Sequence, residues 1–527
     1  KIIPNLGKHA YQIPECNSGA QTYFNQGLRL YYGFRYLESL ASFKAATKAD
    51  SQCAMTYWGQ ALAIKPNPNS RYLRQTDDPK GAGASVIKAA LNFLPQTNKK
   101  HQKLIEALSS WYSSNKNIRD QVYIKRLMQL VKEFPEDHEI STLLAEAIMT
   151  SSAWDYWTPD GRPRPNTTTA IQALEQVIKE NTHHPGANHL FIHLYEDSQT
   201  PEIALDHAMR LAKTMPNVGH MVHMPSHIYI RTGRYEESIK SNFDSIEAAN
   251  KFLGLWGNVA LPFGEPSLSA SDKSHYSHAT DFIALAYYML GNKQLAIKYA
   301  HIISEDSASK LNRFGGFQRR YVKPWMIYRK FSEWDAILRL PLPSKEFELA
   351  FGLATFAVGS AQLQLGNIKS ATKALEELKE LKENPTLQIK MGWVNSVSDI
   401  LEIAYYVLKA EISVNQGKET EAIALYSHAI RLEDGLNYME PPEWGHPVRQ
   451  ELGHLLLTLE RYKEAETIFW EDLRRNPENG WSLNGLKYSL LEQKKNKLAD
   501  EIESRFKASW KLSDTELYFS KAKPNLN

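Results

Sequence analysis

The sequence lacks several features that would assign it at once to a common class of protein. It contains no glycine-rich phosphate loop, no nucleophile elbow and no His-Glu-x-x-His sequence, which excludes the standard forms of three catalytic motifs. No apolar run approaches the roughly 18 residues that cross a bilayer, so we expect no membrane span. The 62 basic and 59 acidic residues leave a formal charge of +3 without a dense Lys/Arg tract. We therefore expect neither nucleic acid nor an anionic membrane as a partner.

Cysteine is also scarce, because the chain has only Cys16 and Cys53. In an oxidising compartment the two could pair and tie the first segment to the repeat that follows; the alternative is two buried free thiols. No Cys-x-x-Cys-His sequence indicates covalent c-type haem. The chain begins at Lys1 rather than Met, which indicates a removed leader or a trimmed chain. We expect an extracytoplasmic location, periplasmic or secreted, with the cytoplasm as the alternative.

Two segments repeat one histidine pattern. Residues 189–196 read His-Leu-Phe-Ile-His-Leu-Tyr-Glu, and residues 220–229 read His-Met-Val-His-Met-Pro-Ser-His-Ile-Tyr. Three matching pairs share one spacing along the chain: His189 and His223, His193 and His227, Tyr195 and Tyr229. This spacing equals the period of about 34 residues that is typical of the helix-turn-helix tetratricopeptide unit.

Several segments carry a second recurring pattern: a small residue in a first helix, an aromatic residue after a turn, and an apolar ridge in a second helix. The first example has Gly27, the turn at 34–36 and Phe43, and later units are centred on Gly359, Ala410 and Gly453. The chain thus resembles the tetratricopeptide repeat family over most of its length, patchily over 65–165 and 250–275. It also resembles a bacterial subgroup of that family with a His-rich HxxHxPSHIY segment, for which the resemblance implies no activity.

This resemblance predicts an all-α fold, a tetratricopeptide-like right-handed helical-hairpin solenoid with inserted loops. Segments rich in Pro, Gly, Asn and Asp mark the insertions. The predicted organisation is an irregular N-terminal segment at 1–19, N-terminal repeats at 20–185 with insertions at 65–84 and 154–167, His-bearing central repeats at 186–310 with an insertion at 252–274, and C-terminal repeats at 311–527.

The paired histidines predict a metal centre. Residues four apart share one face of a helix, and equivalent helices of adjacent repeats lie roughly 8–10 Å apart, so the four paired imidazoles could converge on one centre. By the family's repeat register, the concave groove is lined by His189, His193, Glu196, His220, His223 and His227. Glu196 is expected as a further ligand or as the acceptor that fixes an imidazole tautomer, and His278 as another ligand. Pro225 should interrupt the helix between His223 and His227.

Neutral imidazoles suit a transition metal ion, Cu, Zn or Fe, and the absence of Cys argues against a structural cysteine-type zinc site. Haem with two axial histidines is an alternative, which Met221, Met224 and the tryptophans of the 154–167 insertion could shelter. An open coordination position would allow a metal-dependent oxidoreductase or hydrolase acting on a small molecule under the insertion loops. Glu196 and Glu146 are the predicted acid/base residues.

A different class of function stays open from the sequence. Most tetratricopeptide proteins bind a peptide in the concave groove, so the resemblance equally implies a protein-interaction scaffold without metal. The two hypotheses differ in what they expect of the aromatic insertions. A capped cavity favours a small molecule, whereas an open trough favours a peptide.

Overall fold

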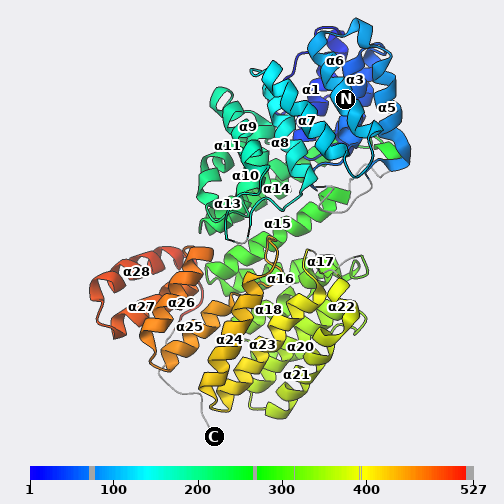
Figure 1. Cartoon of the computed structure of the whole chain (residues 1–527). Helices are drawn as coiled ribbons and strands as arrows, with labels where there is room; N and C mark the ends of the chain where they lie inside the picture. Colours follow the sequence, from blue (N-terminus) through cyan, green and yellow to red (C-terminus); the bar gives the residue numbers. More distant parts are fainter. Residues whose placement is uncertain are drawn as a thin grey trace. The chain divides into compact units, whose positions relative to one another are not determined.

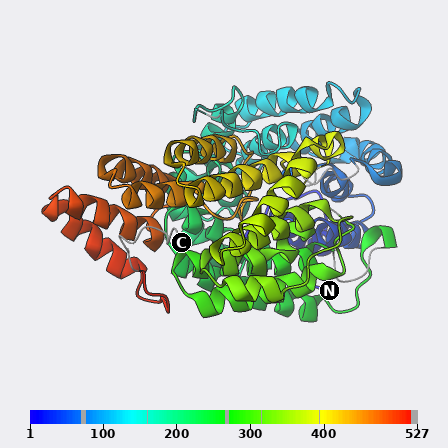
Figure 2. The same ribbon diagram turned by 90° about the horizontal axis from the view of Figure 1, so that it is seen from below.

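The computed structural model describes residues 1–69, 77–158, 160–264, 270–313, 315–390, 392 and 394–517. Over these residues the chain is built from helices joined by turns, and the β-type pairing among them is a single isolated bridge between Trp157 and Pro163 (Figures 1 and 2). The all-α prediction is confirmed. No helix in this part of the chain is long and apolar enough to cross a membrane.

The chain divides into two compact units, which we describe separately. The first comprises residues 1–228 and 240–276, and the second comprises residues 229–239 and 277–527. Helices within the first unit are α1 (Ser18–Tyr32), α2 (Tyr36–Ala49), α3 (Ala54–Ile64), α5 (Ala82–Leu91), α6 (Lys99–Ser113), α7 (Arg119–Glu133), α8 (His138–Ser151), α9 (Thr167–Glu180), α10 (Pro185–Tyr195), α11 (Leu205–Thr214) and α12 (Gly219–His223). Short 3-10 helices lie at η1 (Pro79–Gly81), η2 (Leu94–Gln96), η3 (Pro201–Ala204) and η4 (Pro262–Gly264).

Three helices carry residues of both units: α13 (Pro225–Arg231), α14 (Tyr235–Trp256) and α15 (Ala270–Met289). Helices α14 and α15 thus occupy both ends of the predicted insertion at 252–274, of which residues 265–269 lie outside the described residues. The second unit continues with α16 (Lys293–Ala308), α17 (Gly315–Tyr321), α18 (Lys323–Lys330), α19 (Trp334–Arg339), α20 (Glu348–Gln364), α21 (Ile368–Glu383), α22 (Pro385–Ile389), α23 (Val397–Asn415), α24 (Glu419–Asp434), α25 (Val448–Thr458), α26 (Tyr462–Arg475), α27 (Gly480–Glu492) and α28 (Asn496–Ser509).

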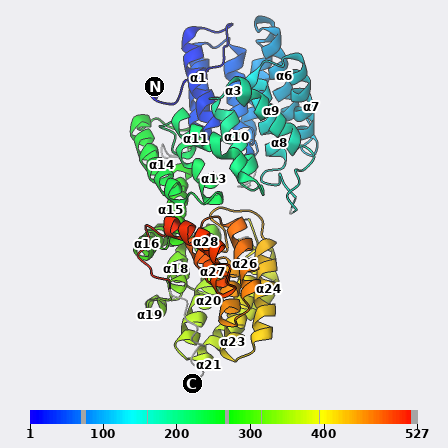
Figure 3. The same cartoon turned by 90° about the vertical axis from the view of Figure 1, so that its left-hand side faces the viewer.

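The helices stack as successive hairpins inside each unit. Consecutive helices pack on each other, as α9, α10 and α11 do in the first unit (Figures 1 and 3). Helices two apart in the chain also make contact, for example α1 with α3 and α25 with α27. This arrangement is the tetratricopeptide-like helical-hairpin solenoid that the repeat period predicts.

A glycine–phenylalanine–glycine sandwich explains the close packing of the first hairpin. The buried ring of Phe43 on α2 lies against Gly27 of α1 and Gly59 of α3, where an added Cβ would come within 2.8 and 2.4 Å of the ring. Phe469 lies in the same way between Gly453 and Gly485, with Cβ distances of 2.6 and 2.2 Å. The three members are evenly spaced along the sequence, and the spacing is identical in both units, so one packing solution is used twice.

Cys16 and Cys53 form a disulfide, which resolves the alternative that the sequence left open. Their Cα atoms lie 5.3 Å apart across a sequence separation of 37 residues. Cys16 precedes α1 and Cys53 precedes α3, so the bond closes a loop around the whole α1–α2 hairpin. Cross-linking removes conformations from the unfolded chain, and a loop of this length gains roughly 4 kcal/mol in the chain-entropy model.

Replacing both cysteines with serine is expected to lower the free energy of unfolding of the first unit by about 3–4 kcal/mol. Denaturant unfolding of the parent with and without reductant measures the effect. The reductant should shift the unfolding midpoint of the parent toward that of the double variant and leave the midpoint of the double variant unchanged. Identical unfolding curves for all four samples would contradict the prediction.

A charged cluster is buried in the second unit. Asp281 on α15 is fully buried; its carboxylate accepts a hydrogen bond from Arg319 and lies 2.8 Å from Lys323 Nζ and 3.7 Å from Arg320 Nε. Burial alone would raise the pKa of Asp281, but the three cations outweigh it and hold that pKa well below its usual range. Burial lowers the pKa of Lys323 to about 8. One carboxylate therefore pairs with cations from two helices, α17 and α18.

Candidate functional site

The repeated histidines lie on α10, α12 and α13 of the first unit. Helix α10 begins with Pro185 and presents His189 and His193 one turn apart, with ring centroids 4.7 Å from each other. The predicted sharing of one helix face is confirmed for this pair. Helix α12 ends at His223 and α13 begins at Pro225, because the proline lacks the N–H that would continue the helix. The side chains of His189, His193, His223 and His227 are all buried.

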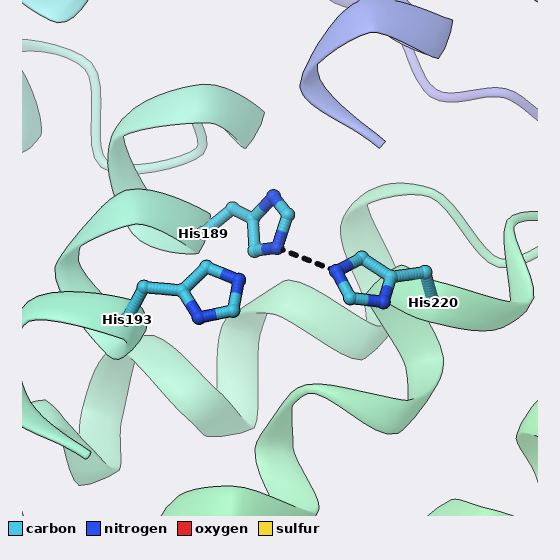
Figure 4. A group of neighbouring side chains, drawn as sticks. All are labelled: His189, His193 and His220. Carbon is cyan, nitrogen blue, oxygen red and sulfur yellow. Dashed lines mark hydrogen bonds between the residues drawn. The ribbon is translucent and has the colours of Figure 1, made fainter. Parts of the chain in front are cut away.

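The ring nitrogens form two groups rather than the predicted single centre. In the first group, the facing nitrogens of His189, His193 and His220 all lie within 4.8 Å of one another. The Nε2 atoms of His189 and His220 are 3.0 Å apart (Figure 4). In the second group, the Nε2 atoms of His223 and His227 are also 3.0 Å apart.

The residue equivalent to His220 in the preceding repeat packs against α1. That residue is Gly186, one repeat earlier, and an added Cβ there would lie 2.3 Å from the ring of Tyr32. Tyr32 of α1 thus packs where the preceding repeat would otherwise carry another histidine. His220 lies beside His189 of α10, so the two repeats differ at this position.

Hydrogen bonds orient the rings of the first group. His189 donates from Nδ1 to the carbonyl oxygen of Tyr32 at 2.6 Å, and His193 donates from Nδ1 to Glu196 Oε1 at 2.8 Å. A carbonyl and a carboxylate only accept, so in the neutral form of both rings Nδ1 carries the hydrogen and Nε2 carries the lone pair. Nε2 of His193 is buried and has no hydrogen-bond partner among the described residues. The group therefore presents unsatisfied imidazole nitrogen to its centre.

The second pair is oriented in the same manner. His223 Nδ1 lies 2.6 Å from the side-chain oxygen of Asn242, and His227 Nδ1 lies 2.7 Å from Glu196 Oε2. Glu196 thus accepts a hydrogen bond from His193 through Oε1, and its Oε2 lies near His227. Burial alone would raise the pKa of Glu196, but His227 and His193 outweigh it and hold that pKa well below its usual range.

The environment favours the neutral form of His189, His220 and His223. Burial lowers the pKa of His189, His220 and His223 well below the usual value, and each is lowered further by neighbouring histidines of the cluster. A protonated imidazole would be desolvated and close to other rings, so the uncharged form is favoured at neutral pH. Neutral imidazole is the form that binds a metal ion.

Aromatic side chains enclose the first group. The ring of Phe34, in the turn after α1, lies 4.3 Å from the ring of His189 and 5.2 Å from that of His220, and it stacks on His193 within 6° of parallel. Trp154, from the predicted insertion at 154–167, packs edge-on against His193 and donates from Nε1 to Glu196 Oε1 at 3.2 Å. The sequence left open whether the aromatic residues of this insertion cap a cavity. It gave no role to Phe34, whose unusual φ of 57° is invisible in the sequence.

The structure also describes Glu146 and His278, the other two residues predicted for the site. The Glu146 carboxylate on α8 is buried, lies 3.3 Å from Lys65 Nζ and accepts a hydrogen bond from the Thr150 hydroxyl. His278 lies on α15 in the second unit and packs edge-on against Phe282. A catalytic role for Glu146 and for Glu196, and metal ligation by His278, stay predictions.

A third cluster, which the sequence did not reveal, contains His9, Glu139 and His184. His184 Nδ1 accepts a hydrogen bond from the N–H of Ala187, so the hydrogen of its neutral ring is on Nε2, 3.7 Å from Glu139. His9 Nε2 lies 3.0 Å from the same carboxylate, which also accepts a hydrogen bond from the Tyr32 hydroxyl. Donors already surround this carboxylate, so the cluster is a hydrogen-bond network that anchors the N-terminal segment on α8 and α10.

A sequence comparison identifies one repeat directly. Residues 403–435, which include parts of α23 and α24, match the profile described as Tetratricopeptide repeat. They form a tetratricopeptide-like hairpin. The match lies in the second unit, outside the histidine cluster, and agrees with the family resemblance of that unit. No curated protein matches the sequence.

Solved structures of other helical proteins resemble the tetratricopeptide-like chain distantly. A human IFIT1 dimer with m7Gppp-AAAA is 12% identical, covers 92% of this chain and 88% of its own, and has a TM-score of 0.34. Yeast Tom70 is 14% identical; the match covers 94% of this chain and 92% of the Tom70 chain, with a TM-score of 0.30. The P58(IPK) TPR domain is 13% identical; the match covers 90% of this chain and 99% of that domain, with a TM-score of 0.21. Similarity at this level assigns no function.

Proposed function

We propose that this tetratricopeptide-like protein binds a transition metal ion through His189, His193 and His220. The observation that carries the proposal is the buried lone pair on His193 Nε2, which has no hydrogen-bond partner among the described residues and lies within 4.8 Å of the other two ligand nitrogens. An orphaned buried nitrogen costs stability unless something binds it. A metal ion would satisfy this nitrogen and its two neighbours together.

The distances support a small ion. Two imidazoles on one ion, each about 2.0–2.1 Å from it, have nitrogens roughly 2.9–3.4 Å apart for bond angles of about 90–109°. The Nε2 atoms of His189 and His220 are 3.0 Å apart. The ligand nitrogens of two axial histidines of a haem would instead lie about 4 Å apart, on opposite sides of the iron. Cu, Zn and Fe as simple ions therefore suit the site better than haem.

Three histidine ligands leave coordination positions open to water or a small molecule, as in catalytic rather than closed structural metal sites. Phe34 and Trp154 limit the space around the imidazoles and favour a small ligand. A metal-dependent oxidation or hydrolysis is the reaction class we propose. The Cys16–Cys53 disulfide supports an extracytoplasmic location, since disulfides persist in oxidising compartments.

Elemental analysis tests the metal proposal. We expect the purified parent to contain bound Cu, Zn or Fe and the His189→Ala/His223→Ala double variant to contain little. A visible spectrum of both reports haem through a Soret band. The matched control is His138→Ala/His183→Ala, which removes two histidines near the surface of the same unit. Equal metal content in the parent and the first double variant would contradict the proposal.

The second candidate function is a protein-interaction scaffold that binds a peptide in the groove. The tetratricopeptide match at residues 403–435 favours it, because this repeat commonly forms peptide-binding surfaces. It expects no bound ion in the parent, even after reconstitution with Cu, Zn or Fe, and saturable binding of an extended or helical peptide. The absence of a nucleic-acid partner stays a prediction of the charge pattern.

A further inference from the structure

We propose that a cavity in the second unit binds a small carboxylate anion of the size of formate. Residues of α15, α17, α18, α20 and the segment before α25 line this cavity, and its polar side chains are those of Tyr288, Arg319, Lys323, Glu443 and His446. The free space inside it admits about one or two water-sized groups. The inference is independent of the metal proposal, because the histidine groups of the first unit do not line this cavity.

The charged groups on one side of the cavity are mostly cations. Arg319 and Lys323 line it, and both pair with the buried carboxylate of Asp281. Arg320 lies 3.7 Å from the same carboxylate. A single carboxylate is thus shared by three cations in a place where charge is poorly screened. A second negative charge in the cavity would offset part of the surplus.

Glu443 and His446 also line the cavity, and neither removes this positive potential. Oε2 of Glu443 already accepts hydrogen bonds from the backbone and side-chain N–H groups of Asn395. Burial lowers the pKa of His446 well below its usual value, and neighbouring lysine and arginine side chains lower it further. The potential at the imidazole is therefore positive although Glu443 is close by, and a bound anion is favoured there.

Two nitrogens of the lining also need a partner. Arg319 directs Nη2 to Asp281 and Nη1 to the carbonyl oxygen of Pro442 at 3.5 Å, but its buried Nε–H has no hydrogen-bond partner among the described residues. Nδ1 of His446 is buried and likewise has none. A buried donor without an acceptor costs stability. An oxygen ligand in the cavity would accept from Arg319 Nε and from Lys323.

The shape of the cavity and the kind of donor indicate a carboxylate. A carboxylate has one negative charge and two acceptor oxygens, which suit a guanidinium N–H and an ammonium group together. The apolar side chains of Leu285, Met326 and Leu353 complete the lining and leave little room beyond these oxygens. Formate matches this space, whereas the methyl group of acetate needs more of it. We therefore expect formate to bind more tightly than acetate.

Equilibrium dialysis of the full chain against radiolabelled formate, at constant ionic strength, tests the proposal. The parent should bind one equivalent. Arg319→Lys keeps the positive charge but lacks the Nε–H, and it should bind formate about 10- to 100-fold more weakly, as expected for one lost hydrogen bond to a charged group. The matched control is Arg449→Lys, which makes the same change at a pair with Asp434 away from the lining. That variant should bind formate like the parent.

Asp281→Asn provides a test in the opposite direction. Removing the carboxylate that competes for the same cations should tighten formate binding, and formate should raise the unfolding midpoint of this variant more than that of the parent. A gain of affinity cannot result from a loss of fold. Weaker binding by Asp281→Asn, with helix content unchanged by circular dichroism, would contradict the proposal.

The remaining outcomes are equally decisive. No bound formate in the parent would show that the cavity holds only water and would overturn the proposal. Equal affinity of the parent and Arg319→Lys would overturn the assignment of the Nε–H as a donor to the ligand. Displacement of formate by an equal concentration of chloride would show that charge alone suffices, and would overturn the assignment of a carboxylate.

Discussion

The Glu196→Gln variant is expected to bind transition metal about 10- to 100-fold more weakly than the parent, the usual effect of losing a carboxylate that orients a histidine ligand. Both carboxylate oxygens lie close to an imidazole Nδ1, at 2.8 Å for His193 and 2.7 Å for His227. Glutamine offers one acceptor and one donor. With the amide nitrogen facing His193 Nδ1, that ring loses its acceptor and reorients, and its Nε2 leaves the position from which it binds metal.

Competition with a chromophoric chelator measures this loss of affinity. The control is Glu180→Gln, which makes the same chemical change at a partly exposed carboxylate 2.9 Å from His138. That variant should bind metal like the parent. Unchanged affinity in Glu196→Gln would show that the carboxylate does not orient a ligand. Circular dichroism of both variants separates a loss of affinity from a loss of fold.

The second large effect concerns stability, because Asp281→Asn is expected to lower the free energy of unfolding of the second unit by about 3–5 kcal/mol. The substitution keeps the size of the side chain but leaves Arg319, Arg320 and Lys323 buried without their carboxylate. Unpaired buried cations are costly, and this cost outweighs the gain from no longer desolvating Asp281. Denaturant unfolding at pH 7 is the measurement.

The pH dependence gives an independent check on Asp281. Its pKa is depressed in the folded protein, so its contribution to stability is complete above the unfolded value of about 3.9 and is lost as the pH falls toward the folded value. The parent should therefore lose stability more steeply than Asp281→Asn below about pH 4. Glu464→Gln, which breaks an exposed pair with Arg461, should change the melting temperature little. Equal acid sensitivity of the parent and Asp281→Asn would contradict the account.

The sequence predicts the fold well because the residues that define each repeat lie close together in the chain at regular intervals. A small residue in a first helix, an aromatic residue after the turn and an apolar ridge in a second helix predict closely packed hairpins, and in the structure Phe43 and Phe469 each lie between two glycines. The placement of paired histidines on one helix face also depends only on residues close together in the sequence. His189 and His193 are predicted and found on one face of α10, since four residues make about one helical turn.

The parts of the site that escape prediction depend on contacts between distant segments. Nothing near residue 189 indicates that the carbonyl of Tyr32 accepts its Nδ1 hydrogen, or that Phe34 packs beneath three imidazoles. The packing of Tyr32 on Gly186 is likewise a contact between distant segments. Periodicity predicts which residues are equivalent, but it does not show which distant side chains pack against them.

The disulfide has a consequence for how quickly an ion could leave. Tyr32 and Phe34, which orient and enclose the first histidine group, both belong to the loop that the Cys16–Cys53 bond closes. An ion held beneath this hairpin escapes only when the hairpin opens locally, and a covalent closure makes that opening rarer. Reduction should therefore accelerate isotope exchange of the bound ion well before it unfolds the chain. The bond at the start of the chain would thereby set the residence time of the metal.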